Sequence, residues 1–132
     1  MDLSGTERGN LLLSLRYSAL GTHMGTVEDV SDQNYAQFTD APAALVAYGL
    51  ATCEPCNQYD PILEETAAKF PQVKIGKAKM HVPGRCREIK KRHIFETYPT
   101  THFFSNGKLL LTREGKVDAA ELSALISDHL LK

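Results

Sequence analysis

Apolar and polar residues follow two different periods along this chain, and the changes of period mark out nine predicted elements. Apolar or alternating runs, which are typical of β-strands, cover residues 26–30, 43–50, 72–80, 101–105 and 108–114. Segments with apolar residues every three or four positions, which are typical of helices, cover 32–39, about 53–70, 84–95 and 118–131. In chain order the elements are β-α-β-α-β-α-β-β-α.

This order predicts one mixed sheet with helices on both of its faces. Strands joined through a helix form crossovers, which place the strands parallel. By contrast, Asn106–Gly107 lies between two apolar runs, and Asn-Gly in that position is typical of a tight antiparallel hairpin. We therefore expect an α/β domain whose central sheet combines parallel strands with a final antiparallel pair.

Local signals predict where the helices begin and how one of them bends. Ser31 is expected to cap the helix that follows it. Asp118, with Glu121 three residues later, is typical of a capping box at the start of the last helix. Pro61 lies inside the pattern of residues 53–70, and we expect it to kink that helix because proline cannot donate a backbone hydrogen bond.

Length and charge exclude several classes of protein. The 132 residues fit a single domain with one core, and a net charge of −1 creates no overall field that would attract nucleic acid or an anionic membrane. No apolar run approaches the roughly 20 residues that span a bilayer. The first residues lack the positive start and long apolar stretch of a secretory signal, so we expect a flexible N-terminal extension at 1–25 and a domain at 26–132.

The cysteines carry the candidate chemistry. Cys53 and Cys56 are separated by two residues at the predicted start of a helix, and Cys86 makes an odd total of three, which argues against a disulfide-stapled secreted scaffold. In an intracellular chain with a βαβ pattern, such a pair is typical of redox chemistry. Two other interpretations are a pair of buried thiols without a role, and a zinc half-site completed by Cys86, His81 or His93.

Four features in this order and spacing resemble the thioredoxin family over roughly residues 26–132. The Cys-x-x-Cys pair closes the strand "ALVAYGL", Pro61 follows five residues after Cys56, "TYPT" precedes a strand, and "FFSNGKLLLTREG" matches a terminal hairpin. The resemblance implies a thioredoxin fold. It also implies a thiol–disulfide oxidoreductase that reduces protein disulfides through a redox-active Cys53–Cys56 disulfide.

The resemblance gives the two cysteines different expected roles. Cys53, at a helix N-terminus where backbone N–H groups and the helix dipole favour a negative sulfur, would attack the substrate disulfide. Cys56, one turn later and more buried, would then attack Cys53 and release the product. Glu54 and Pro55 between them are expected to tune the cycle, since Pro55 restricts the backbone and the charge of Glu54 opposes the thiolate.

Other positions match the family or depart from it. Pro99 is implied to be a cis-proline that faces the disulfide, and Tyr98 before it to border the substrate groove. Thr52 stands where the family has tryptophan, and Ala47 stands where the family has a buried acid. Lys77 matches the family's lysine near that acid. Without the acid, we expect Cys56 to lose its proton slowly, with help from Lys77 or a water.

The resemblance also implies how the protein is supplied with electrons. No bound cofactor is needed because the cysteines carry the electrons. The expected partners are protein disulfide substrates and a separate reductase or reductant, with no nucleic acid and no membrane, and we expect a cytoplasmic monomer.

Three alternatives stay open from the residues themselves. An oxidase or isomerase would act on the same bond, and a thioredoxin-fold binding module would dock partners with little turnover. Cys86 is expected to be an idle packed thiol or else a regulatory one. The basic segment 85–92 is either a solvated helix face or a docking patch for an acidic partner.

Overall fold

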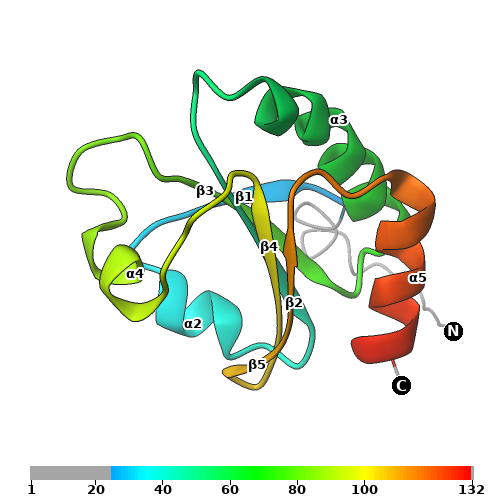
Figure 1. Ribbon diagram of the computed structural model, residues 1–132. Helices are drawn as coiled ribbons and strands as arrows, with labels where there is room; N and C mark the ends of the chain where they lie inside the picture. Colours follow the sequence, from blue (N-terminus) through cyan, green and yellow to red (C-terminus); the bar gives the residue numbers. More distant parts are fainter. Residues whose placement is uncertain (1–24, 132) are drawn as a thin grey trace, which may run out of the picture.

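The computed structural model describes residues 25–131, and in them the predicted elements follow in the predicted order (Figure 1). The strands are β1 (Val27–Val30), β2 (Ala44–Gly49), β3 (Lys74–Lys79), β4 (Thr100–Ser105) and β5 (Lys108–Glu114). The helices are α2 (Tyr35–Thr39), α3 (Glu54–Lys69), α4 (Arg87–Arg92) and α5 (Ala119–His129). The expected extension at 1–25 lies, except for its last residue, outside the described residues.

The sheet has the order β1-β3-β2-β4-β5. β1, β3 and β2 are parallel, whereas β4 is antiparallel to β2 and β5 is antiparallel to β4. α3 and α5 cover one face, and α2 and α4 cover the other (Figure 1). The expected mixed sheet between two helical layers is therefore confirmed. Among residues 25–131, no helix combines the length and apolar character needed to cross a membrane.

Each face of the sheet has its own apolar core. The core under α3 and α5 includes Leu45, Leu63, Ile75, Phe103 and Ile126, all at most 1% exposed. The core under α2 and α4 includes Val30, Phe38, Val46, Tyr48 and Ile89. Because alternate residues of a strand point to opposite faces, the central strand β2 contributes to both cores and is buried along its whole length. The end of β2, which leads to the cysteine pair, is thus held between two packed layers.

Two predicted helix starts have different outcomes. Ser31 does not cap α2: its backbone N–H donates to Asn34 Oδ1 at 2.8 Å, and the helix begins only at Tyr35. That side-chain bond stabilises a turn before the helix in place of a cap. The Asp118 cap is confirmed, because its carboxylate accepts the Glu121 N–H at 2.9 Å. α3 continues through Pro61 as one helix.

The basic helix expected at 84–95 is shorter than predicted. α4 begins at Arg87, and the carboxylate of Asp32 accepts the N–H groups of Glu88 and Ile89 at 3.0 and 3.1 Å. The helix ends before His93, which is already in an extended conformation. The predicted bounds are wrong because the cap comes from a distant segment, which sequence periodicity cannot reveal.

The final hairpin has the expected turn. Asn106 and Gly107 have φ values of 53° and 84°, and positive φ at both central residues is the requirement of the tight turn that Asn-Gly favours. β4 and β5 pair on either side of it, with a register shift between Phe103 and Phe104. The turn is joined to the end of α2, since the Gly107 N–H donates to the Thr39 carbonyl at 2.9 Å.

We expect Gly76→Ala to lower the free energy of unfolding by about 2 kcal/mol, within the range for overpacked cores. A Cβ at Gly76 would lie 2.4 Å from Val30 Cγ2 and 2.7 Å from Phe38 Cζ. Both neighbours belong to the core under α2, so neither side chain can move away without disturbing its own packing. Urea unfolding measures the change. An unaltered midpoint would contradict this packing of β3 against α2.

Candidate active site

Cys53 and Cys56 lie where β2 ends and α3 begins. Cys53 is the N-cap of α3, with extended backbone angles, and Pro55 occupies the first turn, a position that proline favours because no helical N–H is needed there. The two cysteines form a disulfide, and their Cα atoms are 5.2 Å apart, within the usual range of about 4.4–6.8 Å. A short run after Gly49 therefore brings both sulfurs to one end of a helix.

The two sulfurs have different surroundings. Cys56 is only 2% exposed, whereas Cys53 is half-buried. The Cys56 N–H donates to Cys53 Sγ at 3.2 Å. Because free N–H groups and the positive end of the helix dipole stabilise negative charge, Cys53 occupies the position where a thiolate is both favoured and accessible.

The residues between the cysteines are both exposed. Glu54 accepts a hydrogen bond from Gln58 Nε2 at 3.3 Å, so its carboxylate is drawn along the helix surface. Its charge lies in the first turn of α3, where acids interact favourably with the helix dipole. Thr52, in the position that resembles the family's tryptophan, is also exposed.

Pro99 and Tyr98 form the opposite wall of the site. The Tyr98–Pro99 peptide bond is cis, and Cys53 Sγ lies 3.5 Å from the Tyr98 carbonyl oxygen. A reduced Cys53 thiol can donate to that oxygen. The ring of Tyr98 points elsewhere, since it stacks on Phe95 with their centroids 6.0 Å apart. The backbone of Tyr98, rather than its hydroxyl, therefore borders the disulfide.

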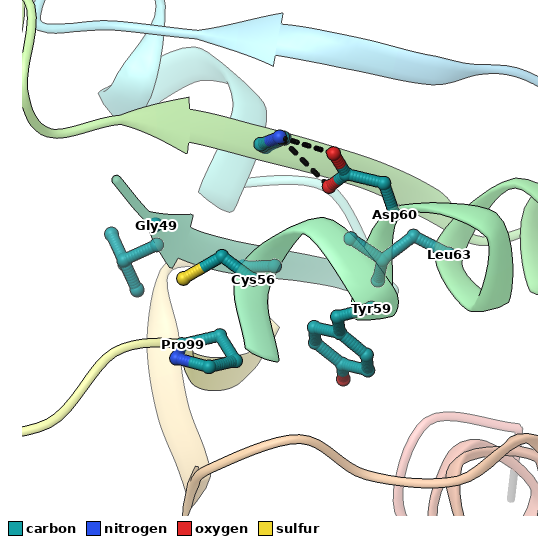
Figure 2. Close-up of a pocket in the computed structure, with 9 residues that line it drawn as sticks. Gly49, Cys56, Tyr59, Asp60, Leu63 and Pro99 are labelled. Atoms are coloured by element: carbon teal, nitrogen blue, oxygen red, sulfur yellow. Dashed lines mark hydrogen bonds and ion pairs between the residues drawn. The ribbon is translucent and has the colours of Figure 1, made fainter. Parts of the chain in front are cut away.

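A small cavity lies behind Cys56. Its wall includes Ala47, Cys56, Asp60, Lys77 and Pro99 (Figure 2). Lys77 Nζ donates to both carboxylate oxygens of Asp60, at 2.7 and 2.8 Å. The predicted lysine is thus close to the cysteine, but its charge is already paired with an acid.

Asp60 and Gly49 also belong to the site but were not predicted from the sequence. Asp60 follows Cys56 by four residues in α3, and that spacing places both on one face of a helix, so a signal was present. At Gly49, an added Cβ would lie 3.2 Å from Cys56 Sγ. This glycine therefore allows the end of β2 to pack directly against the buried sulfur, and only the structure reveals the contact.

Cys86 does not join the pair. It lies at the N-terminus of α4, is 2% exposed and belongs to the core under α2 and α4. Burial raises the pKa of its thiol, which disfavours a reactive thiolate. Within residues 25–131, no group of three or more His, Cys, Asp or Glu side chains could hold a metal ion, so the zinc interpretation lacks completing ligands there.

The basic segment 85–92 is partly engaged in internal contacts. Arg85 forms an ion pair with Asp29, and Lys91 one with Glu88 at 3.5 Å. The guanidinium of Arg92 lies 5.9 Å from the ring centroid of Tyr35. The contacts of Arg85 and Arg92 join segment 85–92 to β1 and α2. Together the three contacts engage three of the segment's cations within this chain.

Comparison with known proteins gives a consistent result. Residues 26–128 match the family model described as thioredoxin. Thioredoxins of Chlamydia pneumoniae and Chlamydia trachomatis are 30% and 31% identical over 103 residues, which is 78% of this chain and 98% of each relative. The solved thioredoxin of Trypanosoma brucei brucei is 21% identical with a TM-score of 0.72, covering 84% of this chain and 96% of that one. A thioredoxin f2 solved in a complex with ferredoxin:thioredoxin reductase is 16% identical, with a TM-score of 0.71, and covers 81% of this chain and 97% of that one.

Proposed function

The chain belongs to the thioredoxin family and is a thiol–disulfide oxidoreductase, and from this premise we propose that it reduces protein disulfides, with Cys53 as attacking thiol and Cys56 as resolving thiol. The observation that carries the proposal is the asymmetry of the pair. The half-buried Cys53 Sγ accepts the Cys56 N–H at the start of α3, while Cys56 itself is 2% exposed. One sulfur is thus suited to meet a substrate and the other to act only within the protein.

In the first step, the Cys53 thiolate attacks one sulfur of the substrate disulfide. The second substrate sulfur leaves as a thiolate and takes a proton from solvent. The exposed start of α3 leaves room for a protein substrate, and the backbone of Tyr98 and Pro99 borders the same sulfur. An extended substrate segment can therefore lie along residues 98–99.

In the second step, Cys56 attacks Cys53. The bond between Cys53 and the substrate breaks, the substrate sulfur leaves as a thiolate, and the Cys53–Cys56 disulfide forms. The substrate has then gained two electrons and two protons, and the protein has lost them. The described disulfide is the product of this step, so a separate reductant must return the protein to its dithiol form.

The proposed partners follow from this cycle. They are protein disulfides on one side and a reductase on the other. The thioredoxin f2 solved with ferredoxin:thioredoxin reductase is a relative for which such a partner is known. We infer no nucleic-acid or membrane partner, because the net charge is only −1. We also propose that the protein is a cytoplasmic monomer active in electron transport and redox homeostasis. The odd number of cysteines supports the cytoplasmic location.

Capture of mixed disulfides tests the proposal. Cys56→Ser leaves Cys53 able to attack but unable to be released, so substrate proteins are expected to accumulate on Cys53 as species that dithiothreitol dissociates. The double variant Cys53→Ser/Cys56→Ser is the matched control and should retain none of them. Retention of the same partners by the double variant would indicate a binding module and contradict the exchange mechanism.

The direction of electron flow has its own measurement. Equilibration of the Cys53–Cys56 couple in graded dithiothreitol and glutathione buffers gives its reduction potential. A reductase is expected to lie near about −270 mV, whereas about −180 to −120 mV is typical of an isomerase or oxidase. A value in the higher range would overturn the reducing direction while leaving the exchange chemistry in place.

A further inference from the structure

Cys56 must lose a proton before it can resolve the mixed disulfide, and its burial makes that step difficult. The side chain is 2% exposed, and burial in apolar surroundings disfavours a thiolate. It also lies beyond the direct reach of bulk water. A nearby base is therefore needed, and the strand position beside it holds Ala47, which has no acid–base chemistry.

Asp60 supplies a carboxylate at this place from a different element. Lys77 on β3 is the register partner of Ala47 on β2, so its side chain rises from the sheet beside the apolar Ala47. The Asp60 side chain extends from α3 toward β3 and accepts two hydrogen bonds from Lys77 Nζ (Figure 2). The ion pair thus links α3 to β3 beside Ala47, the β2 residue that stands where an acid would otherwise lie.

Cys56 and Asp60 line the same small cavity. Cys56, Asp60 and Lys77 all line it, and its volume is about 10 Å³, close to the space of about 10–15 Å³ that one water needs. Three of the residues that line it, Cys56, Lys77 and Asp60, carry a thiol, an ammonium and a carboxylate. A cavity of this size has room for a single water.

The same ion pair also reaches the surface. Asp60, Leu63 and Lys77 line a second, larger groove of about 230 Å³, on the side of β1. The Asp60 side chain is 39% exposed and that of Lys77 is 25% exposed. The pair therefore forms the wall between the inner cavity at Cys56 and a groove on the surface, so a proton on Asp60 has a short way out.

We propose that Asp60, oriented by Lys77, accepts the proton of Cys56 through one water in the inner cavity when Cys56 resolves the mixed disulfide. The inference rests on the function proposed above. The S–H bond of Cys56 breaks, its proton passes to the Asp60 carboxylate, and the Cys56–Cys53 bond forms as the Cys53–substrate bond breaks. The substrate sulfur leaves with the electron pair of that bond and is protonated by solvent, and Asp60 returns its proton to solvent through the outer groove.

Stopped-flow reduction of an aromatic disulfide, whose released thiolate is coloured, separates the two steps. With the reagent in excess, the first phase is the attack of Cys53 on the reagent. The second phase is resolution by Cys56, and its rate does not depend on the reagent concentration. Asp60→Asn is expected to slow only the second phase, by about 10²-fold at neutral pH, the lower end of general-base effects. The difference should shrink above about pH 8.5, where a free thiol ionises unaided. All measurements use a Cys86→Ser background, which removes the third thiol.

Glu64→Gln is the matched control. Glu64 lies one turn further along α3, is exposed, and lines the outer groove but not the inner cavity. Its replacement removes the same charge and should leave both phases unchanged. Two results would overturn the inference and assign Asp60 a merely structural role. One is an equal effect of the two variants; the other is a ratio of parent to Asp60→Asn second-phase rates that does not vary with pH.

A second variant tests whether the position of the acid matters. Ala47→Asp in the Asp60→Asn background places a carboxylate on the other side of the same cavity, and we expect it to restore most of the second-phase rate. A folded double variant without recovery would count against a carboxylate in this cavity. Failure of the parent function is distinguishable, since the first phase and capture by Cys56→Ser would then also be lost.

Discussion

Cys53→Ser is expected to lower the rate of protein-disulfide reduction by more than about 10³-fold, or more than about 4 kcal/mol in the barrier. A thiolate is the nucleophile of disulfide exchange, and a serine hydroxyl does not ionise at neutral pH. The favourable position at the start of α3, with the Cys56 N–H directed at it, cannot compensate for that. Cys56 cannot take over because it is 2% exposed. Turnover with a protein disulfide and dithiothreitol measures the loss.

Cys86→Ser is the control for this prediction. Cys86 is also a buried cysteine, but it lies in the core under α2 and α4, whereas Cys56 lies over the other face of the sheet beside Tyr59 and Leu63. We expect the turnover of the Cys86→Ser variant to match that of the unaltered protein. Substantial activity in Cys53→Ser, or an equal loss in Cys86→Ser, would contradict the assignment of the attacking thiol.

Acidification is expected to destabilise the fold through His102. This residue is 4% exposed, and its Nδ1 lies 3.0 Å from the hydroxyl of Tyr48. Tyr48 in turn shares a 2.8 Å hydrogen bond with Tyr35, whose hydroxyl lies 3.0 Å from His93 Nε2. The rings of His93 and His102 are 4.6 Å apart. Two histidines and two tyrosines thus form one network, buried except at the half-buried His93, between β2, β4, α2 and the end of α4.

The direction of the pH effect follows from the pKa of His102. Burial, and then the nearby His93, lower that pKa from 6.5 to about 4. The neutral ring is therefore the stable form in the folded state, and it contributes about 3 kcal/mol of stability above pH 6.5. This contribution decreases as the pH falls from 6.5 and is lost below about 4. Burial and Arg92 also lower the pKa of His93, so its effect has the same sign.

Urea unfolding of His102→Asn across this range measures the contribution. The amide keeps a polar group near Tyr48 but does not titrate, so the variant should lose less stability on acidification. The stability of the unaltered protein relative to that of the variant is expected to be constant above pH 6.5 and to decrease by about 3 kcal/mol as the pH falls toward 4. Parallel curves for the two proteins would show that His102 is not the group responsible.

Most of the fold could be predicted because its determinants are local. The apolar run of β2, the alternation of β3, the helical period of α3 and the Asn-Gly turn each involve residues a few positions apart. The two misplaced helix starts have different causes, one distant and one local. α4 begins late because Asp32 caps it, and α2 begins late because a turn around Asn34 intervenes.

The site divides in the same way. Cys53 and Cys56 could be identified from spacing, since a pair two residues apart at a helix start has an intrinsic chemistry. Asp60 could not be given a partner from the sequence. Its interaction with Lys77 depends on which side chain of β3 rises under α3, and the register of β2 with β3 decides that. The network around His102 was missed for the same reason, as its members are 13 to 58 positions apart.

By itself, the sequence therefore determined the order of the elements, the family and the reacting pair of sulfurs. Those properties arise from backbone periodicity, turn chemistry and the ionisation of neighbouring thiols, all of which act over a few residues. The tertiary structure alone decided which carboxylate faces the cavity of Cys56, which strand end packs on its sulfur, and which histidine is kept neutral. These depend on sheet register and burial, which exist only once distant segments have packed together.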